Sequence, residues 1–234
     1  MSLIFAENLR KIYQAGEIEI EALKSVSFRI NPASFVAFVG PSGSGKTTLL
    51  NLVGCLDKPT SGVLKVAGLD TFRFTRKKAA LFRGKNIGFI FQDFNLIPVL
   101  TVHENVEYPL LMSQNIPAKE RENQVVSLLD KVNMIDQKDK YPNQISGGQK
   151  QRAAIARALV TDPKLVLADE PTANLDSKSA LMVIELMRSM RDDLGITFVF
   201  STHDPKIVGK VEKLFRIQDG MLSTDNVKRR GDSA

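Results

Sequence analysis

The sequence contains a single cysteine, Cys55, and no uncharged stretch long enough to cross a membrane. A lone cysteine cannot form an internal disulfide, which is typical of proteins from reducing compartments. The longest uncharged stretch, residues 30–45, is interrupted by Pro32, Pro41 and three glycines, whereas a membrane span needs about 20 mainly apolar residues. The first residues carry too short an apolar run for a signal peptide, and we find no internal repeat.

The composition is ordinary for a globular protein. Apolar residues make up 43% and charged residues 25% of the 234 residues, which is enough for one large domain, or one domain with a substantial subdomain. The net charge of +6 allows contact with nucleic acid or an anionic membrane surface, but establishes neither. Six cations occur without one acidic residue between them: Arg73, Arg76, Lys77, Lys78, Arg83 and Lys85. The simplest interpretation is a solvated helix face.

Short apolar runs alternate with helical patterns along most of the chain. The first thirty residues alternate apolar and polar positions, which is typical of half-buried antiparallel strands. Later runs predict strands buried on both faces: residues 35–39, 87–91, 165–168 and 196–200. Helical patterns occupy the intervals: residues 46–55, 153–160 and 178–194. This alternation predicts an α/β fold around a parallel sheet.

The middle of the chain differs from the rest. From about residue 93 to residue 144 the buried-strand pattern disappears, and prolines separate helix-like pieces such as residues 119–132. We therefore expect an α-helical insert, approximately residues 93–160, within a single domain that covers residues 1–234. We expect His103 to be an ordinary surface or capping residue and Cys55 to pack in the core. The polar tail from Asp225 onward has the composition of a frayed end.

One segment matches the phosphate-binding pattern G-x-x-x-x-G-K-[ST]: Gly40, Pro41, Ser42, Gly43, Ser44, Gly45, Lys46 and Thr47. Glycines let successive backbone N–H groups point into one concavity that holds phosphate oxygens. The helix that follows adds the partial positive charge of its N-terminus. Lys46 can reach the β and γ phosphates, and the Thr47 hydroxyl can bind Mg²⁺. An apolar strand precedes the segment and a helical pattern follows it, which is the context a phosphate loop requires.

Two carboxylates, Asp169 and Glu170, follow the strand predicted at residues 165–168. Ligands of open parallel sheets bind at this end of the strands. Asp169 is suited to hold Mg²⁺ through water, and Glu170 is suited to activate an attacking water as a general base. With a phosphate loop in the same chain, we interpret this pair as catalytic.

A second anion site is predicted at residues 146–149, Ser-Gly-Gly-Gln. Ser146 has the character of a helix N-cap, and residues 150–160 have a helical pattern. Gly147 and Gly148 would weaken a purely structural helix, but they allow a ligand to approach the backbone closely. Exposed N–H groups at a helix N-terminus bind anions.

Together and in this order, these motifs resemble the nucleotide-binding subunits of ABC transporters, over almost the whole chain. The segment Ile-Ser-Gly-Gly-Gln resembles the LSGGQ signature, with Ile145 in place of leucine. Gln92 matches the Q-loop glutamine, which in the family binds Mg²⁺ and links to the membrane subunit. Asp176, in Ala-Asn-Leu-Asp, matches the D-loop, and His203 the switch histidine that contacts the γ phosphate. Tyr13 stands where the family stacks an aromatic ring on adenine.

The resemblance implies an ATPase that uses ATP and Mg²⁺. The implied catalytic residues are Glu170, His203 and Lys46, and the implied metal ligands are Thr47, Gln92 and Asp169. The implied nucleotide-binding residues are Tyr13, Gly40, Pro41, Ser42, Gly43, Ser44, Gly45, Lys46, Thr47, Thr48, Gln92, Ser146, Gly147, Gly148, Gln149 and Asp176. The implied partners are an integral membrane permease and a second copy of the chain in an ATP-dependent head-to-tail homodimer. The implied location is peripheral, on the cytoplasmic face of the inner membrane.

Finer strings at residues 51–60, 91–98 and 100–106 resemble the lipoprotein-releasing and macrolide-exporter branch of the family. Its members dock on permeases with long extracytoplasmic domains. This implies export or extraction of a lipoprotein or another hydrophobic substrate. The basic stretch at residues 73–85 departs from the branch, where more acidic residues are expected.

Other functions are weighed against this one. A regulatory ABC ATPase that signals through a membrane partner without transport would use the same cassette, so the sequence does not separate the two. A non-transport ABC ATPase acting on nucleic acid or the ribosome is supported by the basic stretch, although such relatives carry two cassettes or a long coiled-coil insert. A GTPase or small-molecule kinase is opposed by the signature at residues 146–149 and by the lack of an N-K-x-D motif. The substrate and the direction of transport are not readable from the sequence.

Overall fold

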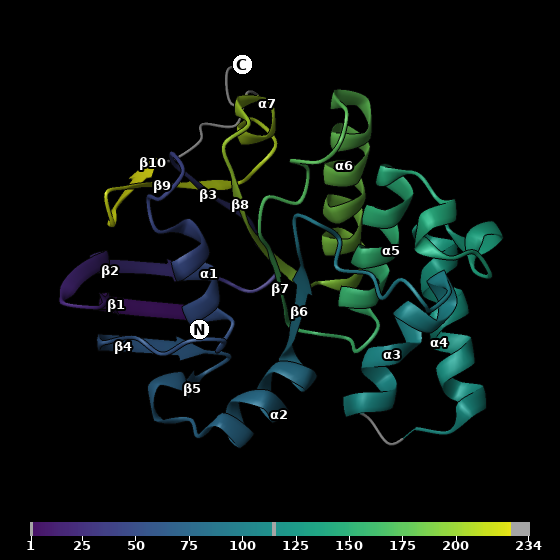
Figure 1. Ribbon diagram of the computed structural model, residues 1–234, viewed down its shortest axis with the longest axis horizontal. Helices are drawn as coiled ribbons and strands as arrows, with labels where there is room; N and C mark the ends of the chain where they lie inside the picture. The colour runs from purple at the N-terminus through teal and green to yellow at the C-terminus, as the bar shows by residue number, and fades with distance from the viewer. Residues whose placement is uncertain (1, 114–115, 226–234) are drawn as a thin grey trace, which may run out of the picture.

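A computed structural model describes residues 2–113 and 116–225 (Figure 1). An antiparallel sheet lies at one side, a group of helices lies at the other, and a second sheet runs between them. Asp225 ends the last strand, and the rest of the expected frayed tail, residues 226–234, lies outside the described residues. Within the part described, no helix has the length and apolar character needed to cross a membrane.

The alternating pattern of the first thirty residues forms two long antiparallel strands, as predicted. They belong to a four-stranded sheet with the order β2-β1-β4-β5. Its strands are β1 (Ile4–Ala15), β2 (Ile18–Ile30), β4 (Ser61–Val66) and β5 (Leu69–Asp70). Ile4 pairs with Ile30 on one side and with Val66 on the other, so β1 is the central strand of the three longer ones.

The second sheet has the order β10-β9-β3-β8-β7-β6. Its strands are β3 (Phe35–Val39), β6 (Ile87–Ile90), β7 (Leu165–Ala168), β8 (Thr197–Thr202), β9 (Lys213–Gln218) and β10 (Met221–Asp225). The strands from β9 to β6 are parallel, and only β10 pairs antiparallel. The four predicted buried strands are β3, β6, β7 and β8, which confirms the predicted fold class. The β9–β10 hairpin was not predicted.

Helices cover the second sheet and fill the middle of the chain (Figure 1). The α-helices are α1 (Lys46–Val53), α2 (Arg76–Asn86), α3 (Val102–Ser113), α4 (Ala118–Lys131), α5 (Gly147–Leu159), α6 (Ser177–Leu194) and α7 (Pro205–Val208). Short 3₁₀ turns are η1 (Thr71–Arg73), η2 (Ile135–Gln137) and η3 (Pro142–Gln144). Helix α5 contacts α3 and α4 on one side and β6 and α6 on the other, so it joins the helical insert to the sheet.

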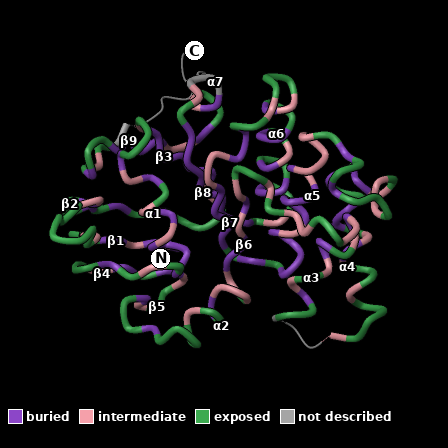
Figure 2. Tube along the Cα trace, in the orientation of Figure 1, coloured by how far each residue is buried: buried purple, intermediate pink, exposed green. Residues whose placement is uncertain are grey.

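The core has two parts, one on each face of the second sheet (Figure 2). Strand β3 is apolar throughout because both of its faces are buried. Phe35 faces the helices α3 to α6, whereas Phe38 faces α1 and the antiparallel sheet. Phe38 stacks on Phe215 of β9 with 5.1 Å between ring centroids. Cys55 is 8% exposed, and burial raises the pKa of its thiol to about 11. The expectation that Cys55 packs in the core is confirmed.

His103 is half-buried and does not lie fully at the surface. Its side chain is only 16% exposed, and its Nε2 lies 2.7 Å from the Glu122 carboxylate of α4. His103 therefore joins α3 to α4 inside the insert instead of capping a helix at the surface. The sequence offered no sign of this pair because its members come from different helices.

Strand β6 packs so tightly against α5 that a glycine is required at position 88. A Cβ added to Gly88 would lie 2.1 Å from the Ala158 carbonyl oxygen, and a backbone oxygen cannot move without shifting its helix. We expect Gly88→Ala to lower the free energy of unfolding by about 1–3 kcal/mol. Urea unfolding followed by circular dichroism measures this change. Gly209→Ala is the control because open space surrounds Gly209; equal midpoints for the two variants would contradict this packing.

Candidate functional site

The predicted catalytic residues meet at one edge of the second sheet. The phosphate loop follows β3, Asp169 and Glu170 follow β7, and His203 follows β8, which lies between β3 and β7. Because the three strands are parallel, their carboxyl ends reach the same edge. There they border a cavity of about 820 Å³. The predicted site residues that line it are Pro41, Ser42, Gly43, Gly45, Lys46, Thr47, Thr48, Gln92, Asp169, Glu170 and His203.

The phosphate loop closes tightly around its own lysine. Lys46 Nζ donates to the carbonyl oxygens of Gly40 (2.8 Å) and Pro41 (2.9 Å). Gly45 has φ 107°, a conformation that favours glycine. A Cβ on Gly40 would lie 2.0 Å from the Ile217 carbonyl oxygen. The loop therefore depends on glycine at both positions.

The loop also holds a buried polar atom without a partner. Ser44 is 3% exposed, and its hydroxyl makes no hydrogen bond to any described residue. A buried hydroxyl of this kind costs free energy unless a ligand or water satisfies it. Together with the N-terminus of α1, this atom fits an anionic ligand held by the loop.

A chain of hydrogen bonds positions the two carboxylates. Thr47 Oγ1 donates to Asp169 Oδ2 at 2.9 Å, and Ser201 Oγ donates to Asp169 Oδ1 at 2.6 Å. The backbone N–H of Glu170 donates to Ser201 Oγ at 2.9 Å. Ser201, on β8, therefore holds the Asp169 carboxylate and the backbone of Glu170 at once. The sequence analysis missed Ser201, since only strand pairing reveals that it lies beside Asp169.

Glu170 connects the lysine of the loop to the histidine of β8. Its Oε2 lies 2.9 Å from His203 Nδ1, and its Oε1 lies 4.0 Å from Lys46 Nζ. The Glu170 side chain is 16% exposed, whereas that of His203 is 67% exposed. A carboxylate so placed, at the mouth of a cavity lined by phosphate-binding groups, can accept a proton from a water that attacks a phosphoryl group.

The oxygen donors around the cavity fit a magnesium ion. The Thr47 hydroxyl and the Asp169 carboxylate are in contact, and Gln92 lines the same cavity. Mg²⁺ prefers oxygen ligands, takes few of them from protein and keeps several waters. Over residues 2–113 and 116–225 there is no cluster of three histidine, cysteine, aspartate or glutamate residues that would hold a metal on its own. A metal at this cavity would thus rest on few protein ligands and on the phosphates.

The segment predicted as a second anion site lies on a different surface. Ser146 and Gln149 form a capping box at α5: Ser146 Oγ accepts from Gln149 N–H at 3.3 Å, and Gln149 Oε1 accepts from Ser146 N–H at 2.8 Å. Ser146, Gly148 and Gln149 line a small hollow with Ser179 of α6. None of the residues lining this hollow lines the phosphate cavity. The predicted N-cap role of Ser146 is confirmed, and the hollow at Ser146 does not meet the phosphate cavity of the same chain.

Tyr13 and Asp176 have structural contacts of their own. The Tyr13 hydroxyl donates to Asp57 Oδ2 at 2.9 Å, and Tyr13 does not line the phosphate cavity, whereas Ile20, its cross-strand partner, does. Burial first, and then the Asp57 hydrogen bond, raise the pKa of Tyr13. Asp176 caps α6 by accepting from the N–H groups of Lys178 and Ser179. Hydrogen bonding to the Ser179 side chain first, and then to the backbone N–H groups of Ser179 and Lys178, lowers the pKa of Asp176.

A clamp on the segment after Gln92 was also missed by sequence reasoning. Phe94 and Asn95 have φ of 61° and 48°, which is strained for residues other than glycine. The Arg157 guanidinium of α5 donates to both of their carbonyl oxygens. Asn174 Nδ2 donates to the Gln92 carbonyl oxygen at 3.1 Å. Burial lowers the pKa of Arg157 below its ordinary value, and this half-buried cation binds the segment to α5.

The fold and the site define a phosphate-loop ATPase. A family model described as "ABC transporter" matches residues 23–173, and the chain belongs to this family. The structure is similar to a solved structure of the ATP-binding cassette MJ0796, with a TM-score of 0.88 and 40% sequence identity. The match covers 97% of this chain and 99% of that one. That structure is described as a dimeric post-hydrolysis state bound to ADP and Pi.

Curated relatives point to the same family. An uncharacterized ABC transporter ATP-binding protein of Thermotoga maritima is 45% identical and covers 94% of this chain and 93% of its own length. The bacitracin export ATP-binding protein BceA of Halalkalibacterium halodurans is 41% identical, over 96% of this chain and 88% of its own. The macrolide export ATP-binding/permease protein MacB of Syntrophobacter fumaroxidans is 40% identical, over 97% of this chain but 32% of its own. The chain is an ATP-binding and ATP-hydrolysing subunit of an ABC transporter.

The position of Ser201 generates a test of the site geometry. We expect Ser201→Ala to lower kcat for ATP hydrolysis by about tenfold or more, because it releases the Asp169 carboxylate and the Glu170 backbone from their shared hydrogen-bond partner. Steady-state phosphate release measures this change. Ser189→Ala removes another serine hydroxyl, whose bond to the Leu186 carbonyl oxygen lies at the surface of α6, and serves as the control. Equal rates for the two variants would show that Ser201 does not position the carboxylates.

Proposed function

We propose that this chain drives a membrane permease that exports or extracts a lipoprotein or another hydrophobic substrate. The exporters MacB and BceA support the direction of transport, and the strings at residues 51–60, 91–98 and 100–106 support the branch. MacB carries its cassette and its permease in one chain, which supports a permease as the partner. Such a partner would hold the chain on the cytoplasmic face of the membrane as a peripheral subunit.

One observation carries the proposed mechanism: the two anion sites of a chain lie on separate surfaces. The phosphate cavity and the hollow at Ser146 share no lining residue. A nucleotide in the cavity can contact a signature segment, residues 145–149, only if that segment comes from a second copy of the chain. We therefore propose a head-to-tail homodimer in which each ATP lies between Lys46 of one copy and Ser146, Gly147, Gly148 and Gln149 of the other. The dimeric MJ0796 cassette supports this assembly.

Within each site, residues of this chain divide the work. Lys46 and His203 would bind the γ phosphate, and Glu170 would accept the proton of the attacking water. Thr47, Asp169 and Gln92 would hold Mg²⁺, which when bound neutralises phosphate charge. The remaining loop residues and Thr48 would bind phosphate oxygens, Tyr13 would contact the base at the margin of the cavity, and Asp176 would face the partner copy.

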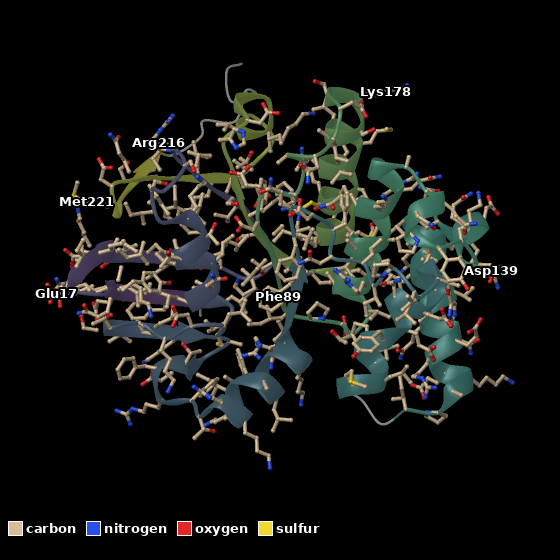
Figure 3. The ribbon with its side chains drawn as sticks, in the orientation of Figure 1. Glu17, Phe89, Asp139, Lys178, Arg216 and Met221 are labelled. Atoms are coloured by element: carbon tan, nitrogen blue, oxygen red, sulfur yellow. The ribbon has the colours of Figure 1, made fainter. Side chains whose placement is uncertain are left out.

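A groove beside β6 is the proposed docking site of the permease. It has a volume of about 420 Å³ and is lined by residues of α2, α3, α5 and β6, among them Phe89, which Figure 3 labels. Its walls are largely apolar and include Tyr108 and Met112, which are 42% and 68% exposed. Asn95 and Arg157 also line it, and Gln92, three residues before Asn95, lines the phosphate cavity. We propose that residues 93–160 move as the helical subdomain that carries motion between these two sites.

Glu170→Gln tests the dimer. The amide cannot accept the proton of the attacking water, so we expect kcat to fall by about 100-fold or more while ATP binding persists. Because unhydrolysed ATP holds the two copies together, we expect a dimer with ATP in size-exclusion chromatography with light scattering. Adding Lys46→Ala to this variant removes a phosphate-binding group, and we expect the double variant to be monomeric. A Glu170→Gln protein that stays monomeric with saturating ATP would contradict the head-to-tail site.

Met112→Asp tests the groove. Met112 lies outside the phosphate cavity, so we expect its basal ATPase rate to match that of the unchanged protein. A charge on the apolar wall should abolish co-purification with the permease and any stimulation of ATPase by it. The partner to test first is a permease encoded beside this gene. Met221→Asp, at an exposed methionine of β10, controls for the added charge; normal co-purification of Met112→Asp would contradict docking in this groove.

A further inference from the structure

The outer face of α2 carries positive charge that the structure does not neutralise. Arg73 lies 3.3 Å from Asp70, Arg83 donates to the Cys55 carbonyl oxygen at 2.8 Å, and Lys78 lies 4.8 Å from the centre of the Phe74 ring. Three other cations are exposed: Arg76, Lys77 and Lys85. Across the described ranges, no carboxylate forms an ion pair with any of these three.

An exposed leucine lies between two of these lysines. Leu81 is 68% exposed, and Lys77 and Lys85 lie one turn before and after it on the same side of the helix. The opposite side is anchored in the core, since Phe82 is 7% exposed and packs edge-on against Phe74 at 5.2 Å. A single exposed leucine needs no explanation. A leucine framed by lysines on one helix face has the chemistry of a surface that meets charged headgroups and the apolar region beneath them.

The position of α2 adds a second, independent argument, which rests on the proposed function. Ala80, Arg83 and Gly84 of α2 form one wall of the groove assigned to the permease. A permease segment in that groove comes from the membrane, so the side of the cassette that carries α2 faces the bilayer. In Figure 1, α2 and α3 lie together along one edge of the molecule, opposite the end where α7 lies.

We propose that the outer face of α2 binds anionic lipid headgroups beside the permease. Lys77 and Lys85, with Arg76, supply the attraction, and each cation near such a surface strengthens binding about fivefold. Leu81 inserts between the headgroups. Nucleic acid fits this face less well, because phosphate contacts account for the cations but leave the leucine in their midst without a role.

Vesicle binding of the whole protein, without any permease, tests the proposal. The probe is a set of vesicles of phosphatidylcholine and phosphatidylglycerol in a ratio of about two to one, compared with vesicles of phosphatidylcholine alone. We expect binding to the anionic vesicles only, falling as salt rises. Lys77→Ala combined with Lys85→Ala should weaken binding by about 25-fold, and Leu81→Ser should weaken it further.

A charge-matched double variant is the control. Lys140→Ala combined with Lys178→Ala changes the net charge equally, at exposed positions outside α2. Figure 3 labels Lys178 at the N-terminal end of α6, away from α2. We expect this variant to bind vesicles nearly as the unchanged protein does, and all variants to keep the basal ATPase rate. Equal losses in the two double variants would overturn the proposal, because the attraction would then come from net charge alone.

Two other results would also overturn it. If the α2 double variant loses more affinity for duplex DNA than for vesicles, the face recognises nucleic acid. If it binds vesicles normally but no longer co-purifies with the permease, the face contacts an acidic segment of that protein. The proposed function is tested separately, by the co-purification of Met112→Asp with the permease. Vesicle binding is measured without a permease, so its result does not depend on that test.

Discussion

The parallel pairing of β3, β8 and β7 is the constraint on which the site depends. Val39 pairs with Thr202 at one end of this ladder, and Ala168 pairs with Phe200 beside it. The residue after each strand therefore emerges at a common edge, although the three segments are far apart in sequence. A shift of one residue would turn Ser201 to the other face of the sheet and separate it from Asp169. The core on both faces of β3 fixes this register, so the packing of apolar side chains also positions the carboxylates.

The structure joins two sites that lie on different surfaces of one chain. Gln92 lines the phosphate cavity, and Arg157 holds the segment that follows it to α5, the helix that carries Ser146 at its N-terminus. In a head-to-tail dimer, each copy would contact its own nucleotide through Gln92 and its partner's nucleotide through Ser146. The segment between Gln92 and α5 would connect the two contacts. The positive φ of Phe94 and Asn95 shows that the connection is held against its local preference. A strained, multiply bonded segment is suited to transmit motion between sites, because it has few alternative conformations.

The fold places part of the positive charge of the chain on the outer face of α2. The net charge of +6 says nothing about a partner, since mildly basic proteins are common. On α2, however, exposed cations and an exposed leucine lie on the same side of the cassette as the apolar groove. The groove would be filled by protein and the helix face would meet lipid, so one side of the molecule would serve both contacts. The opposite end, where α7 lies, does not share this surface.

The sequence by itself determined the phosphate loop, the acidic strand end and the capping box at Ser146, because each is a local pattern whose chemistry depends on neighbouring residues. It also determined the α/β class, since buried strands and helices have different periods. Only the tertiary structure decided that Ser201 holds Asp169, that Arg157 and Asn174 hold the segment after Gln92, and that Ile20 instead of Tyr13 lines the cavity. These contacts join residues from separate strands and helices, and their partners are chosen by strand order and helix packing. A linear pattern cannot encode that choice, because it carries no information about which segments become neighbours in space.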